Sequence, residues 1–129
     1  MPVTSAASGL ALVPPGTVSE ASGDGAAVEV PANGPRLFVL ELIITQVIEQ
    51  ESLEISIWGS PDGQDWGKMP LLKFPQQFYC GAARMALDLS DRPELRFIRP
   101  RWELNRWGRG VPKPRFTFGL LARPASAKR

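Results

Sequence analysis

The sequence predicts an all-β protein: a single antiparallel β-sandwich of about seven to eight strands, jelly-roll-like or immunoglobulin-like, with an extended N-terminal arm. Apolar and polar residues alternate along several segments, most cleanly over residues 53–58, and this period of two is typical of half-buried strands. Turn residues such as Pro61-Asp62-Gly63 separate these segments. Thirteen prolines and twelve glycines among 129 residues also suit short strands joined by turns.

The N-terminal residues 1–25 are rich in alanine, serine, glycine, proline and valine, and such a segment cannot bury enough apolar surface on its own to offset its ordering entropy. We therefore expect an extended arm over 1–25, the sandwich domain over 26–123 and a basic tail over 124–129. The arm residues expected to dock on a neighbouring subunit are Leu10, Leu12 and Val13.

The strands of the domain follow in order from the apolar pattern. They are expected over residues 27–30, 36–48, 53–58, 69–74, 84–89, 95–104 and 115–122. In the long segment 36–48 the even positions are mostly apolar and the odd positions are mixed, which predicts one buried face and one partly covered face. Its β-branched and aromatic residues favour a strand over a helix.

The last two strands are predicted to pair as a hairpin. The first would place Ile98, Trp102 and Leu104 on its buried face, and the second an inward row that consists of Phe116, Phe118 and Leu120, with Arg115, Thr117 and Gly119 outward. Pro100 lies inside the first of them, which argues for an edge position or a bulge because proline has no N–H for a ladder.

Charge is divided unevenly along the chain. Residues 1–60 hold one basic and seven acidic side chains, a net −6, whereas residues 61–129 hold fourteen basic and six acidic ones, a net +8. Opposite patches on one small domain would favour head-to-tail association with other copies. The alternative is that the two halves neutralise each other within the fold.

Few residues suit catalysis. The chain has no histidine and a single cysteine, Cys80, which excludes a Ser-His-Asp triad, a Cys-His pair and an intrachain disulfide. Cys80 is expected as a small, partly buried apolar residue. Asp62 and Asp65 are interpreted as turn-stabilising side chains, because a calcium site needs more oxygen ligands. We expect no enzyme activity, metal, cofactor or small-molecule substrate.

No segment approaches the roughly 20 apolar residues that span a bilayer, and the N-terminus lacks the basic start and apolar run of a signal peptide. We therefore expect a protein of the cytoplasm, or of a particle assembled there.

The loop over residues 105–114 is the best candidate site. It is basic, and it centres on one tryptophan, a residue type that is common with arginine in interface hot spots. Its candidate partner-binding residues are Arg106, Trp107, Arg109 and Lys113. The alternative is that Trp107 folds back onto the end of the sandwich.

A third interpretation is single-stranded nucleic-acid binding, since cations that meet phosphates and aromatic rings that stack on bases define such surfaces. The basic residues concerned are Arg92, Arg96, Arg99, Arg101, Arg106, Arg109, Lys113 and Arg115, with Trp102 and Trp107 among them.

The order of motifs resembles two groups of proteins. The motifs are the strand and turn of residues 53–66, the segment Leu95-Arg96-Phe97-Ile98-Arg99-Pro100-Arg101-Trp102, and Phe116-Thr117-Phe118. They resemble small β-sandwich structural proteins of tailed phages and phage-derived particles. They also resemble discoidin-type binding domains, which share the Asp-Gly-x-x-Trp turn. The resemblance covers residues 36–122.

The phage resemblance implies a non-enzymatic structural or assembly subunit: a capsid-decorating protein, a head or tail component, or a filament or shell protein. Its partners would be other copies of itself or another structural subunit. The discoidin resemblance implies a carbohydrate-binding module, in which Trp58, Trp66 and Trp107 would stack on sugar rings.

Overall fold

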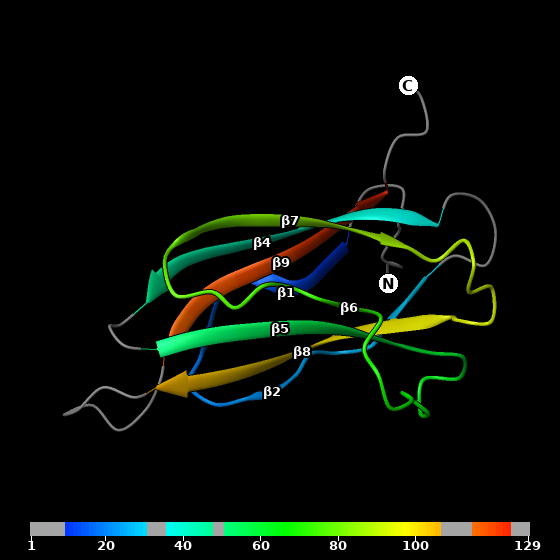
Figure 1. Ribbon diagram of the computed structural model, residues 1–129, viewed down its shortest axis with the longest axis horizontal. Helices are drawn as coiled ribbons and strands as arrows, with labels where there is room; N and C mark the ends of the chain where they lie inside the picture. Colours follow the sequence, from blue (N-terminus) through cyan, green and yellow to red (C-terminus); the bar gives the residue numbers. More distant parts are fainter. Residues whose placement is uncertain (1–9, 31–35, 48–50, 107–114, 125–129) are drawn as a thin grey trace.

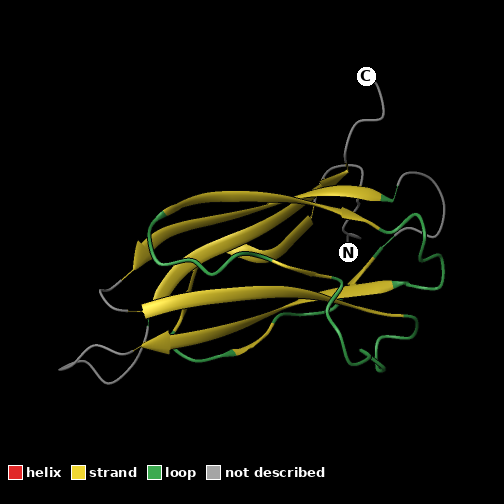
Figure 2. Cartoon of the chain, in the orientation of Figure 1, coloured by secondary structure: helices red, strands yellow, loops and turns green. Residues whose placement is uncertain are grey.

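A computed structural model describes residues 10–30, 36–47, 51–106 and 115–124. These residues form strands, turns and loops, with no helix among them (Figure 2), so no helix in this part of the chain could cross a membrane. The strands make two antiparallel sheets that lie one above the other (Figure 1). The predicted all-β sandwich is confirmed.

The first sheet, sheet A, has the order β1-β9-β4-β7. Its strands are β1 (Leu10–Ser19), β9 (Phe116–Pro124), β4 (Leu37–Val47) and β7 (Gly81–Asp88). Sheet B has the order β2-β8-β5-β6, and β3 pairs with β8 beside β2. Its strands are β2 (Gly23–Asp24), β8 (Phe97–Arg106), β5 (Glu51–Ser60), β6 (Leu72–Lys73) and β3 (Val28–Glu29).

The core lies between the sheets and is built from the apolar rows that the period of two predicts. β4 and β9 supply large buried side chains from sheet A, and β5 and β8 supply them from sheet B. On these four strands the largest fully buried side chains are Phe38, Leu40, Leu42, Leu53, Ile55, Ile57, Ile98, Phe116, Phe118 and Leu120.

The N-terminal segment differs from the expectation of a separate arm. β1 pairs with β9 from Leu10 opposite Ala122 to Ser19 opposite Phe116, and Leu12 and Val13 are only 4% and 2% exposed within the chain's own core. The physical reason is that β9 is apolar on its inner face and needs a hydrogen-bonding neighbour on both sides. The prolines of β1 are tolerated because they lie where its register with β9 shifts, between Val13 and Thr17.

The predicted hairpin of the last two strands is wrong. β8 pairs with β5 along its whole length, and β9 pairs with β1 and β4 in the other sheet. The two strands instead face each other across the core, where the rings of Trp102 and Phe118 meet edge to face at 5.6 Å. Both strands carry large inward side chains, and these interdigitate between the two sheets to form the core.

The outer face of β9 is also more covered than expected. Thr117 and Gly119, assigned outward, do lie on that face but are buried. The irregular part of β1 lies against Gly119. A side-chain carbon on Gly119 would come within 2.7 Å of the Pro15 Cα atom.

Candidate functional site

The turn after β5 is held by its own side chains. The Ser60 hydroxyl oxygen accepts hydrogen bonds from the Asp62 and Gly63 amides at 3.2 and 2.8 Å. Asp62 Oδ1 accepts from the Gln64 and Asp65 amides, both at 2.9 Å, and Gly63 supplies the positive φ that the turn requires. These two backbone bonds, with the Ser60 hydroxyl bond, lower the pKa of Asp62 below 3.8. The turn-stabilising role of Asp62 follows from these bonds.

That turn places Trp66 on the outer face of sheet B, beside β8. The Arg99 guanidinium lies over the Trp66 ring at 4.3 Å from its centroid, and the Arg101 guanidinium lies 5.5 Å from the centroid of Trp58. Trp58 Nε1–H donates to Ser56 Oγ at 2.9 Å. Guanidinium groups bind the negative faces of aromatic rings, so each of these tryptophans has one face against an arginine.

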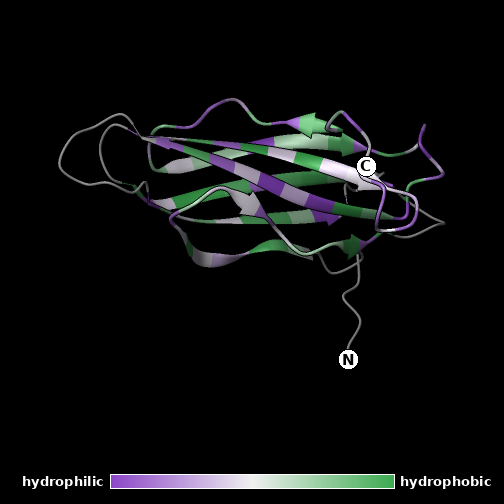
Figure 3. Ribbon diagram, turned by 90° about the horizontal axis from the view of Figure 1, so that it is seen from below, coloured by the Kyte–Doolittle hydropathy of each residue, from purple (hydrophilic) through white to green (hydrophobic). Residues whose placement is uncertain are grey.

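The same arginines bind a carboxylate from β2. Asp24 lies 3.9 Å from Arg99 and 3.3 Å from Arg101. Figure 3 shows the molecule from below, where hydrophilic and hydrophobic residues alternate along the strands, as expected for strands with one face in the core and one in solvent. We call Asp24, Trp58, Trp66, Arg99 and Arg101 the Arg–Trp lattice.

Ion pairs join the acidic and basic halves of the chain in other places too. They link Lys73 to Glu54, Arg84 to Glu41, Arg96 to Glu29 and Arg115 to Glu20. The charge split therefore leads to pairing inside one chain, which was the alternative to head-to-tail association. The arginines proposed for nucleic acid at positions 92, 96, 99, 101 and 115 each have a carboxylate partner within 4 Å.

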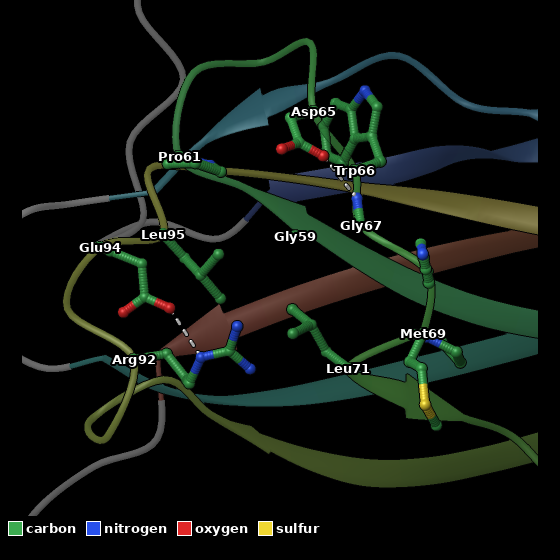
Figure 4. Close-up of a pocket in the computed structure, with 12 residues that line it drawn as sticks. Gly59, Pro61, Asp65, Trp66, Gly67, Met69, Leu71, Arg92, Glu94 and Leu95 are labelled. Atoms are coloured by element: carbon green, nitrogen blue, oxygen red, sulfur yellow. Dashed lines mark hydrogen bonds and ion pairs between the residues drawn. The ribbon is translucent and has the colours of Figure 1, made fainter.

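A pocket of about 410 Å³ lies beside the turn, at one end of the sandwich (Figure 4). Leu71 and Leu95 point toward one another inside it, and Gly59 leaves room between them. Its charged rim includes Arg92 and Glu94, which bind each other at 2.8 Å. This bond lowers the pKa of Glu94, and it pairs the two charges at this part of the rim.

Arg36 is a buried residue that sequence reasoning assigned only to the start of a strand. It is 8% exposed, and its guanidinium donates hydrogen bonds to the carbonyl oxygens of Leu89, Arg92 and Leu95 at 3.3, 2.9 and 2.9 Å. It thereby holds the connection between β7 and β8. No local signal marks this role, because the partners lie more than fifty residues away in the sequence.

The edge of sheet A at β7 was not singled out from the sequence either. The segment before it carries Phe78 and Tyr79, which are 39% and 78% exposed and whose ring centroids lie 6.2 Å apart. Cys80 is exposed, contrary to its expected partial burial, because the chain turns there from the edge of sheet B to the edge of sheet A.

The residues predicted to bind a partner do not form one site. Leu12 and Val13 lie in the core, and Leu10 pairs with Ala122 at the start of β1. Arg106 ends β8 opposite Glu51. Trp107, Arg109 and Lys113 lie outside the described residues.

Within the described residues no group of three or more histidine, cysteine, aspartate or glutamate side chains is placed to hold a metal ion. No protein-family model matches the chain, and no curated protein and no solved structure matches it.

Proposed function

We propose that this protein is a non-enzymatic structural subunit that assembles with copies of itself into a larger particle. The observation that carries the proposal is the edge strand β7. Within the described residues only β4 pairs with β7, so one full side of an eight-residue strand is left without a ladder. Natural proteins rarely leave a long regular edge open, because its unpaired N–H and C=O groups recruit another strand.

The outer face of sheet A supports the same proposal. Along β4 and β9 this face carries Val39, Ile43 and Leu121, which are half-buried, and Leu37, which is 38% exposed. Val18 of β1 adds a side chain that is 54% exposed. The charged side chains at the middle of this face, Glu41 and Arg84, bind each other at 3.1 Å. An apolar face next to an open edge is typical of a surface that meets protein.

The outer face of sheet B is a weaker candidate for binding. In the Arg–Trp lattice the cations are paired with Asp24 and stacked on the rings. A sugar or a nucleobase would have to displace these contacts before it could stack on the covered ring faces. The resemblance of the motifs to phage particle subunits supports self-assembly. We also propose that the particle forms in the cytoplasm and that it can contain other structural subunits.

The test is the mass of the full chain in solution, by light scattering over a wide concentration range at low and at high salt. We expect a species heavier than the 14.1 kDa chain that persists at high salt, because backbone pairing and apolar contact are not screened as exposed charges are. A 14.1 kDa species at all concentrations would overturn the proposal. Saturable quenching of tryptophan fluorescence by a glycan in that case would favour the carbohydrate-binding alternative.

A further inference from the structure

The direction of each peptide group in β7 follows from its register with β4. The Leu89 N–H donates to the Arg36 carbonyl oxygen at 2.9 Å, one residue beyond the pair Leu37–Asp88. In an antiparallel ladder, hydrogen-bonded pairs alternate with pairs that exchange no bonds. The odd residues of β7 therefore bond to β4, and the peptide groups of Ala82, Arg84, Ala86 and Asp88 point to the open edge.

This edge lacks three of the features that usually prevent strand pairing. From Gly81 to Asp88 the strand contains no proline, and its register with β4 runs without a shift from Ile44–Gly81 to Leu37–Asp88. Its inward row, Ala83, Met85 and Leu87, carries no charge. Bulges, prolines and inward-pointing charges are the common protections, and β7 has none of them.

The side chains of β7 select one self-pairing. Suppose that two copies pair antiparallel about a two-fold axis. The outward peptide groups bond only if even-numbered residues lie opposite even-numbered residues. Near the middle of the strand, an axis at Arg84, Met85 or Ala86 meets this condition. An axis at Arg84 places two arginines directly opposite each other, which is repulsive. An axis at Met85 places Arg84 opposite alanine. An axis at Ala86 places Arg84 opposite Asp88 of the partner subunit, twice by symmetry.

We propose that β7 pairs with β7 of a second copy about a two-fold axis at Ala86, with Arg84 of each chain opposite the partner subunit's Asp88. This inference rests on the proposed self-assembly and assigns its contact. Each hydrogen-bonded pair, at residues 84, 86 and 88, exchanges two backbone bonds. The pairing joins two four-stranded sheets into one continuous sheet, and it extends the apolar outer face across both copies.

The charges needed for this register are present and exposed. The Arg84 side chain is 66% exposed and contacts Glu41 at 3.1 Å, so its guanidinium would lie between Glu41 and the incoming carboxylate. Asp88 Oδ1 accepts a hydrogen bond from the Ser90 amide at 2.9 Å. Hydrogen bonds from the Ser90 side chain and backbone also lower the pKa of Asp88.

Charge reversal tests the register. Arg84→Asp puts carboxylates opposite each other at both symmetric positions, and Asp88→Arg does the same with arginines. We expect each variant alone to dimerise more weakly by a factor on the order of 30. An equimolar mixture of the two variants restores Asp–Arg opposition, so heterodimers should recover the wild-type affinity in sedimentation velocity. A merely structural role for either residue would not produce this rescue, and its absence would overturn the register.

Cysteine cross-linking gives a second, independent test in a Cys80→Ser background. Opposite residues in a hydrogen-bonded pair have Cα atoms about 5.5 Å apart, which suits a disulfide. Ala86→Cys should therefore form a covalent dimer on mild oxidation. Ala82→Cys is the matched control: it is also an exposed alanine on the outer side of β7, but the two copies of residue 82 would lie roughly 27 Å apart.

The outcomes separate this inference from the proposed function. Oligomers by light scattering without an Ala86→Cys cross-link or a charge rescue would retain self-assembly and overturn the β7 contact. Equal cross-linking at both cysteine positions would also overturn it, because it would report random collision. A monomer under all conditions would overturn both proposals.

Discussion

The two sheets differ in how their edges are built. On the β2–β3 side of sheet B the edge is made of two strands of two residues each, and it is interrupted opposite Pro100 of β8. The Gly25 N–H donates to the Pro100 carbonyl at 2.8 Å. The backbone N and O atoms of a strand residue point to the same side. The Pro100 nitrogen, which carries no hydrogen to donate, therefore also faces this interruption. Sheet A has edge strands β1 and β7, and at the β7 edge the strand runs for eight residues without a register shift.

Ion pairs add to this contrast. Asp24 in β2 binds Arg99 and Arg101, and Glu29 in β3 lies 3.8 Å from Arg96, so side chains fix an edge that has few backbone bonds. Among the described residues β7 carries one such link, from Arg84 to Glu41. The charges of this chain therefore secure the short β2–β3 edge, whereas the uninterrupted β7 edge is left to pair with another strand.

Proline substitutions test this contrast at β7 with the largest expected effect. Ala83→Pro removes an N–H that bonds to β4, so we expect a loss of about 3 kcal/mol in the free energy of unfolding, measured by urea denaturation. Ala86→Pro removes an N–H that points to the open edge. We expect this variant to keep most of its stability, because Met85, the residue before the new proline, is already extended. It should lose self-association, because the removed N–H would bond to the second copy. Equal destabilisation by both prolines would contradict the assigned peptide directions.

A glycine substitution tests the β2–β3 edge of sheet B. A side-chain carbon on Gly25 would lie 2.5 Å from Pro100 Cγ and 3.3 Å from the Leu12 carbonyl oxygen. Neither atom moves freely, so Gly25→Ala should cost about 1–3 kcal/mol of stability in thermal or urea unfolding. The control is Gly23→Ala in the same edge, whose new carbon would lie 3.7 Å from the Trp102 ring in ordinary contact. Folded Gly25→Ala protein should self-associate as the wild type does. A loss of assembly would indicate that copies meet at the β2–β3 edge rather than at β7.

Removing the charge of Asp24 should have a smaller effect on the same edge. The Asp24 side chain is 37% exposed, and exposed ion pairs contribute about 0–1 kcal/mol. Asp24→Asn should therefore lower stability by about 1 kcal/mol at low salt and by less at high salt. Urea unfolding at two salt concentrations measures this difference. A loss that salt does not reduce would show that Asp24 acts through packing rather than charge.

The smallest effect concerns the turn that carries Trp66. The folded-state pKa of Asp62 lies below its ordinary value of 3.8, so the ionised carboxylate stabilises the folded state. This contribution is fully present above pH 3.8 and is lost as the pH falls through the lowered folded-state pKa. We expect the melting temperature of the wild type to fall more steeply in this acid range than that of Asp62→Asn, measured by circular dichroism. Parallel curves would assign the acid sensitivity to other carboxylates.

The sequence was sufficient for the long strands β4, β5, β8 and β9 and for their buried faces. The alternation in residues 53–58 places Leu53, Ile55 and Ile57 in the core, because the pleat alone decides which side chains share a face. The turn chemistry of Pro61-Asp62-Gly63 was also readable, since its bonds join residues two or three positions apart.

Pairing between distant segments could not be derived in the same way. A period of two does not say which strands are neighbours, so the hairpin of β8 and β9 was expected and the pairing of β1 with β9 was not. Arg36 and the open edge of β7 depend on the same long-range arrangement. The charge split was visible, but only the strand order shows that Asp24 and Glu29 lie beside their arginines.

The amide hydrogen exchange of Ala86, followed by NMR as the protein concentration is raised, tests the open edge most directly. Its N–H is assigned to the side of β7 that faces away from β4, so in the monomer it should exchange much faster than the Met85 amide, which lies in the ladder. We expect exchange at Ala86 to slow as the protein assembles, whereas exchange at Met85 should change little. An Ala86 amide that stays fast in the assembled protein would contradict the pairing of β7 with a second copy.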